Sequence, residues 1–109
     1  MSSPLTDLPI YNQGGTTYTV ADSDCGAMID HSNASATTIT LPADKPRGFI
    51  VSFTQSGAGQ ITFSAGSGAT IHSRGSKLKT AGQYAAASAV VKSNAGGAAV
   101  WLLTGDLTS

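Results

Sequence analysis

Three aspartates near the start of the chain are the residues best suited to binding a cation. Asp22, Asp24 and Asp30 form the one concentration of acidic residues, and a hard cation requires several oxygen ligands. The same residue types also build turns, because an aspartate side chain hydrogen-bonds nearby backbone and glycine tolerates a positive φ. The segment 22–26 ends in glycine, so we expect a turn here and predict no metal site.

The two histidines, His31 and His72, are potential ligands of a second kind of metal site, together with the single cysteine, Cys25. Zinc motifs usually pair their ligands at tight spacing, whereas these histidines are 41 residues apart. We expect both on polar strand faces; the alternative is a metal held on the axis of a trimer by one histidine from each chain. A lone cysteine excludes an intramolecular disulfide.

The residues needed for catalysis are not gathered into any known motif. No Gly-x-Ser-x-Gly segment marks a nucleophilic serine, and the chain has no glutamate to join its aspartates in a pair of catalytic carboxylates. The glycine-rich turns lack the Lys-Ser/Thr ending of a phosphate-binding loop. The sequence therefore predicts that the protein is not an enzyme and takes no cofactor.

The aromatic residues offer a possible carbohydrate-binding platform, since Tyr11, Tyr18, Tyr84 and Trp101 have rings that stack on sugars. Trp101 lies in the most apolar segment of the chain, residues 98–104. We expect it in the core or at a subunit interface. A glycan-binding function requires instead that aromatic rings are exposed on the 73–82 loop or on the tips of hairpins.

Composition excludes two classes of partner. Charged residues make up 11% of the 109 residues and the formal net charge is zero, so the basic field needed for nucleic acid is missing. Arg74, Lys77 and Lys79 form a small loop cluster that we expect to be solvated. No apolar run approaches the roughly 20 residues that span a bilayer, and Met1–Asp7 has no secretory signal, which predicts synthesis in a cytoplasm. A neutral surface of small residues favours a subunit packed in an assembly.

The elements that must position these residues are short β-strands. Phe49, Val51 and Phe53 alternate with Ile50, Ser52 and Thr54, and glycine turns divide residues 48–72 at regular intervals. This pattern predicts a meander of consecutive antiparallel strands. The expected fold is all-β, a small antiparallel β-sandwich or jelly-roll-like barrel. The expected strands span residues 16–20, 27–31, 37–41, 49–54, 61–64, 70–72, 83–92 and 98–104.

Residues 1–13 are predicted to form an extended N-terminal arm ahead of a single domain at 14–109. Prolines at positions 4 and 9 hold the residues before them extended, while Leu5, Leu8, Ile10 and Tyr11 make the segment more apolar than a solvated tail. We expect these four residues to dock on a partner surface. The strand around Trp101, the fifth predicted partner-binding residue, is expected to pack in the core or against another subunit. The alternative is a first strand that covers the protein's own core.

The order of the motifs also resembles a family. Thr38-Ile-Thr-Leu-Pro42, Gly48-Phe-Ile-Val51, Gln55-x-Gly-Ala-Gly-Gln-Ile-Thr-Phe63, Gly66-x-Gly-Ala-Thr-Ile71 and Trp101-x-Leu-x-Gly-Asp-Leu107 are similar to a β-rich module of tailed-bacteriophage virion proteins. The module occurs in tail fibres, head fibres and small capsid-associated proteins, and the resemblance covers residues 16 to 107.

The resemblance implies a virion role and no active site. We expect a non-enzymatic structural protein, a capsid decoration or cementing protein made in the host cytoplasm, in contact with other virion proteins and forming a homotrimer. One alternative is a tail-fibre or tail-tip module that binds a host surface glycan. The other is a free-standing carbohydrate-binding module.

Overall fold

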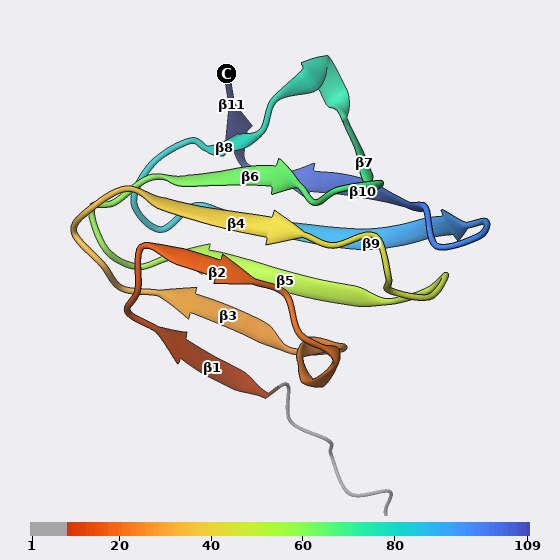
Figure 1. The fold of residues 1–109 in the computed structure, drawn as a ribbon. Coiled ribbons are helices and arrows are strands. Elements are labelled where there is room, and N and C mark those ends of the chain that lie inside the picture. The colour runs from red at the N-terminus through yellow and green to blue at the C-terminus, as the bar shows by residue number, and fades with distance from the viewer. Residues whose placement is uncertain (1–8) are drawn as a thin grey trace, which may run out of the picture.

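The computed structural model describes residues 9–109 and consists of two β-sheets packed face to face (Figure 1). The predicted all-β fold is confirmed, and the two helical segments are single 3-10 turns, η1 (Asp22–Asp24) and η2 (Arg74–Ser76). Sheet A runs in the order β1 (Ile10–Gln13), β3 (Met28–His31), β5 (Ile50–Gln55), β9 (Ala86–Asn94), β10 (Ala99–Gly105) and β7 (Thr70–Ser73). Sheet B runs in the order β11 (Leu107–Thr108), β8 (Lys79–Thr80), β6 (Ile61–Ala65), β4 (Thr37–Leu41) and β2 (Thr17–Thr19).

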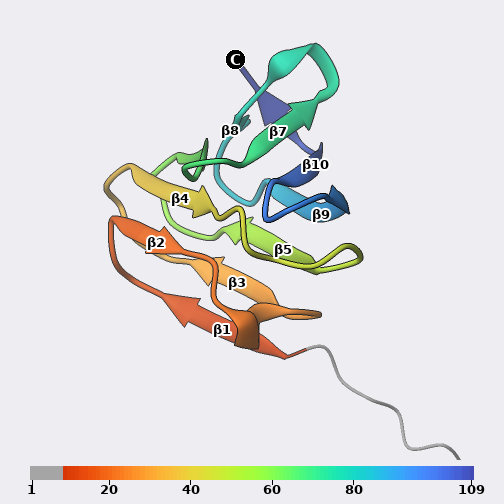
Figure 2. The same cartoon turned by 45° about the vertical axis from the view of Figure 1, so that its right-hand side comes forward.

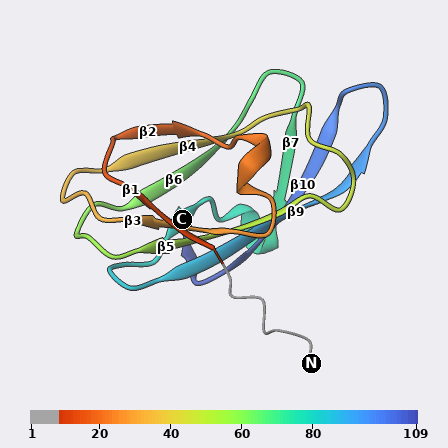
Figure 3. The same ribbon diagram turned by 90° about the horizontal axis from the view of Figure 1, so that it is seen from below.

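The first six strands wind between the two sheets like the coils of a solenoid. Odd-numbered strands enter sheet A and even-numbered strands enter sheet B, and each pairs in parallel with the strand of the next coil. Seen from below, β2, β4 and β6 lie on one side and β3, β5 and β9 on the other (Figure 3). Antiparallel pairing enters sheet B at β8, which joins β6 on one side and β11 on the other, and enters sheet A at β9, which joins β5 and β10. Both sheets are therefore mixed.

The predicted antiparallel meander over residues 48–72 is wrong in its pairing. β5 and β6 lie in different sheets, and the turn between them crosses from one layer to the other. The glycines of this turn are needed for stacking: a Cβ on Gly59 would overlap the carbonyl oxygen of Ser35 in the turn of the preceding coil. Gly59 N–H also donates to Asn33 O at 3.0 Å. Apolar alternation marks which face of a strand is buried, and that pattern is the same for either pairing.

The strand positions themselves follow the sequence closely, including the hairpin near the C-terminus. β4 occupies residues 37–41 as expected, and β9 and β10, expected at 83–92 and 98–104, pair antiparallel around a turn at 94–97. Asn94 Oδ1 accepts the backbone N–H of Gly97 at 2.9 Å, and Gly96 and Gly97 both have positive φ. The turn residues thus supply the backbone geometry that a tight hairpin requires.

The N-terminal region divides at the limit of the described residues. Ile10–Gln13 form β1, which pairs in parallel with β3 at one edge of sheet A. Four residues of the predicted arm therefore belong to the sheet. Leu5 and Leu8 lie outside the described residues.

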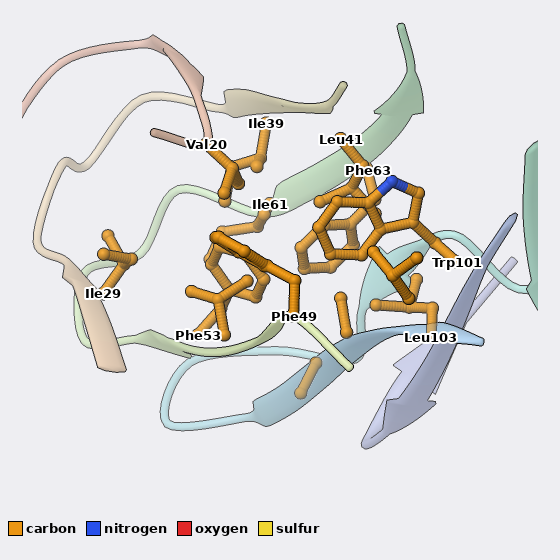
Figure 4. Packing of buried hydrophobic residues seen from close by; sticks show 14 of the residues in the cluster. Val20, Ile29, Ile39, Leu41, Phe49, Phe53, Ile61, Phe63, Trp101 and Leu103 are labelled. Carbon is orange, nitrogen blue, oxygen red and sulfur yellow. The ribbon is translucent and has the colours of Figure 1, made fainter. Parts of the chain in front are cut away.

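The core fills the space between the sheets with side chains from both layers (Figure 4). Phe53 and Phe63 meet edge to face at 5.0 Å between ring centroids, and Phe49 meets Trp101 in the same way at 5.8 Å. Trp101 is fully buried and its Nε1–H donates to Pro42 O at 2.9 Å. Of the two places predicted for Trp101, the core and a subunit interface, the structure shows the core.

Candidate docking surface

The outer face of sheet A carries a row of aliphatic side chains. The strand register places Ile50 opposite Val90, and Val90 opposite Leu102, across three adjacent strands. These residues alternate with the buried ones, so their side chains point away from sheet B. Ile50 is 43% exposed, and the other two are half-buried. The row is therefore an apolar stripe on the outside of the protein.

The neighbouring row of the same face is uncharged and continues to the edge strand. Ile10 lies opposite Met28, and Met28 lies opposite Ser52. Ser52 and Ser88 hydrogen-bond to each other across the strands at 3.0 Å, which uses their polar groups internally. Ile10 is 59% exposed. This row thus offers water few free polar side chains, whereas the third row of the face, Asn12, Asp30 and Thr54, is polar.

The outer face of sheet B has the opposite character, although it is built from the same kind of coil. Thr17, Thr38 and Thr62 are in register on its three parallel strands, and Thr19, Thr40 and Ser64 form a second row. Exposed threonine suits a solvated strand because its branched side chain packs on the pleat while the hydroxyl faces water. The contrast between the two outer faces identifies sheet A as the candidate docking surface.

Charges are sparse on sheet A. Among its six strands, β5 and β10 have no ionisable side chain, and the charged residues are Asp30 on β3 and Lys92 near the end of β9. The Ser56 hydroxyl donates to the Asp30 carboxylate. The apolar row itself therefore carries no charged side chain, as is usual in the buried centre of a protein–protein contact.

The predicted partner-binding residues divide into three groups. Ile10 and Tyr11 lie on the edge strand β1, where they are 59% and 43% exposed. Trp101 is buried in the core and has no surface to offer a partner. Leu5 and Leu8 fall in the segment before residue 9, so the structure does not place them.

Sequence reasoning missed Ile50 and Leu102 as surface residues. The signal for Ile50 was present, because it is the apolar member of an alternation whose other outward positions are Ser52 and Thr54. Leu102 belongs to residues 98–104, the most apolar segment of the chain, where no alternation marks an outer face. Its neighbours across the sheet follow only from the register, which no local pattern specifies.

The aspartates act as turn and ion-pair residues. Asp24 accepts the Tyr18 hydroxyl at 2.5 Å and the backbone N–H of Ala21 at 2.8 Å. Asp22 pairs with the buried Lys45 at 2.6 Å. Burial and the neighbouring Asp24 carboxylate raise the pKa of the Tyr18 hydroxyl above its ordinary value. This local network fixes the η1 turn, as expected from the sequence.

The histidines are far apart in the fold. His31 points into the core between Tyr18 and Phe53, with ring centroids 6.3 Å from each, and neither of its nitrogens has a hydrogen-bond partner. Burial lowers the pKa of His31 to about 4. The expectation that it lies on a polar face is therefore wrong. His72 is exposed at the opposite edge of sheet A, and nowhere in residues 9–109 do three histidine, cysteine or acidic side chains gather to hold a metal.

A pocket of about 590 Å³ lies at the other end of sheet A from β1. Its lining includes Arg74 and Lys77 from the loop after β7, together with Leu102, Thr104 and Leu107. The predicted solvated loop cluster thus borders an apolar hollow. The chain segments that form the pocket are far apart in sequence, so no local motif predicted it.

Comparisons with known proteins add no family to this description. No protein-family model, curated protein or solved structure matches the chain at a significant level. In the part of the chain described by the structure, no helix is long and apolar enough to cross a membrane.

Proposed function

We propose that this chain is a non-enzymatic structural protein of a tailed-phage virion. It docks on the capsid shell as a decoration or cementing protein, through the outer face of sheet A and the adjoining strand β1. The virion assignment rests on the sequence resemblance over residues 16–107. Localisation in the virion, contact with other virion proteins and assembly as a homotrimer are parts of the same proposal.

The observation that carries the proposal is the difference between the two outer faces. One bears the uncharged row of Ile50, Val90 and Leu102, and the other bears registered threonines. A monomer that made no contacts would gain nothing from an aliphatic row facing water, whereas a subunit docked on a neutral surface gains by burying it.

The free energy of docking is modest for one subunit, and the symmetry of a shell multiplies it. Burying apolar area contributes about 25 cal/mol per Å², and three half-exposed aliphatic side chains therefore supply a few kcal/mol at most before the cost of association. A shell presents many identical sites, so subunits that also contact one another bind with avidity. Weak individual contacts are then sufficient for a stably decorated particle.

Cosedimentation tests the docking face directly. Shells of the phage that encodes the chain, prepared from a strain that lacks the gene, are mixed with purified protein and pelleted. The wild-type protein should pellet with the shells, and the Ile50→Lys variant should stay in the supernatant. Thr38→Lys places the same charge on the outer face of sheet B and should pellet like wild type. Equal binding by all three proteins would refute docking through sheet A.

One observation favours a second candidate, a glycan-binding tail-fibre or tail-tip module. Tyr84 lies two residues beyond the 73–82 loop, which has no aromatic residue of its own. It is 75% exposed and has a positive φ of 70°, and strained exposed aromatic residues occur at ligand-binding loops. Its N–H is held by Gln55 O, so the ring projects from a fixed backbone. A glycan array separates the two functions: this candidate requires sugar binding that is lost in Tyr84→Ala, while the capsid proposal requires none.

A further inference from the structure

The pocket beside η2 combines two cations with apolar walls. Arg74 and Lys77 are exposed residues of the loop that follows β7, and a left-handed turn at Gly75 and Ser76 sets their positions. Leu102 and Leu107 line the same hollow from β10 and β11. Of the basic residues in the described part of the chain, only Lys45 forms ion pairs. A ligand that fits this pocket carries an anionic group next to an aliphatic one.

The pocket also adjoins an open strand edge. β7 pairs with β10 as far as Ser73 opposite Leu103, and β10 continues to Gly105 without a β7 partner. Thr104 and Gly105 then line the pocket where β7 has left the sheet. An extended peptide is the ligand that suits an exposed strand edge flanked by side-chain pockets. Asp106 follows in sequence, but its carboxylate forms no ion pair with the loop cations.

The chain itself contains a peptide of this chemistry. Residues 4–9 are Pro-Leu-Thr-Asp-Leu-Pro, and the two prolines favour an extended backbone. In an extended segment, alternate side chains share a face, so Leu5 and Asp7 point to one side while Thr6 and Leu8 point to the other. One face of the segment therefore offers an aliphatic group and a carboxylate together.

Asp7 cannot reach the pocket of its own molecule. β1 and β10 are four strand steps apart in sheet A, which is roughly 19 Å at about 4.8 Å per step. Asp7 precedes Ile10 by three residues and reaches at most about 10 Å from it. Figure 2 shows β1 and the β7–β8 excursion at opposite ends of the protein. The segment that meets the cations must come from another molecule.

We propose that the pocket at Arg74, Lys77, Leu102 and Leu107 receives residues 4–8 of a second copy of this chain, with Asp7 at the cations and Leu5 against the leucines. Each copy then has one donor segment and one receptor pocket, at opposite ends of sheet A. Such a head-to-tail contact closes into a ring when the rotation between copies allows it, and otherwise forms a filament. Leu102 lines this pocket and also ends the aliphatic row of sheet A, so the two contacts adjoin at that residue.

A peptide titration tests the contact. A fluorescein-labelled peptide of residues 1–10 is added to protein that lacks residues 1–8, and binding is followed by anisotropy. The peptide should bind, and Asp7→Asn or Leu5→Ser in the peptide should weaken binding by about tenfold or more. The Leu8→Ser peptide is the matched control, because its altered side chain points away from the pocket, and it should bind within about threefold of wild type.

Charge reversal on the protein tests the receptor side. The double variant Arg74→Glu/Lys77→Glu should no longer bind the wild-type peptide and should bind an Asp7→Lys peptide instead. The control variant Arg47→Glu should bind the wild-type peptide as the unaltered protein does. All three altered residues are exposed, so the variants should keep the fold, which circular dichroism checks. Failure of the wild-type peptide to bind, or equal binding of a scrambled peptide, would overturn the proposal.

Light scattering gives an independent outcome at the level of the whole chain. The full-length protein should form a complex of several subunits that falls to a monomer when residues 1–8 are removed or when Arg74 and Lys77 are reversed. An unchanged mass in these variants would contradict arm exchange. It would leave the cosedimentation test of sheet A unaffected, so the two proposals fail separately.

Discussion

Replacing His31 with leucine should raise the stability of the protein in acid and remove one step from its pH dependence. His31 is enclosed by Tyr18 and Phe53, and neither ring nitrogen has a hydrogen-bond partner. The core therefore holds the imidazole neutral, and burial lowers its pKa to about 4 from an ordinary value of 6.5. The nearby Asp30 acts in the opposite direction and is the smaller influence.

The sign of the effect follows from which state binds the proton. Between pH 6.5 and pH 4 the unfolded chain is protonated at His31 while the folded chain is not, so the free energy of unfolding increases with pH across this window. The free energy of unfolding that depends on a neutral His31 is fully present above pH 6.5 and is lost as the pH falls to 4. A difference of about 2.5 pKa units corresponds to about 3 kcal/mol.

Urea denaturation of both proteins between pH 7 and pH 4.5 measures this difference. The wild-type protein should lose about 2 to 3 kcal/mol more than His31→Leu over that range, visible as a midpoint shift of roughly 2 M at an unchanged m-value. If the difference in the free energy of unfolding between the wild-type protein and His31→Leu stays constant with pH, the reasoning is refuted.

Two further substitutions test the packing of the fold. Gly59→Ala should destabilise the protein by more than about 3 kcal/mol or prevent folding, because the added Cβ would overlap Ser35 O. Gly14→Ala is the control, since nothing lies near its Cβ, and it should change stability by less than about 1 kcal/mol. Thermal melts of the two variants measure the difference. Trp101→Phe should cost about 2 to 3 kcal/mol, since it removes buried volume and the hydrogen bond to Pro42 O. A urea-derived loss below about 1 kcal/mol would contradict the assigned role of the indole.

The strands were predictable because burial alternates with a period of two. Ile39 and Leu41 mark the inner face of β4, and Phe53 marks that of β5, in agreement with the structure. Pairing was not predictable by this route, since a coil that crosses between sheets and a hairpin give the same alternation. The decisive residue was Gly59, whose close approach to the preceding turn becomes visible only in three dimensions.

The candidate surfaces show the same division. Ile10 and Tyr11 were expected at a surface and are exposed there, while Trp101 proved to be core. His31 was expected on a polar face because histidine is polar; its position in register with Gln55 instead places it inward. Sequence spacing indicates the face of a strand, but the contacts across a sheet depend on long-range register.

The most direct test of the virion assignment is the amount of this chain in purified particles. Quantitative mass spectrometry would compare particles of the encoding phage grown with the wild-type gene, with Ile50→Lys or with Thr38→Lys. The proposal predicts that the wild-type and Thr38→Lys chains are present at a copy number in fixed ratio to the major capsid protein, and that Ile50→Lys is lost. Absence of the wild-type chain from the particles, or equal retention of Ile50→Lys, would contradict it.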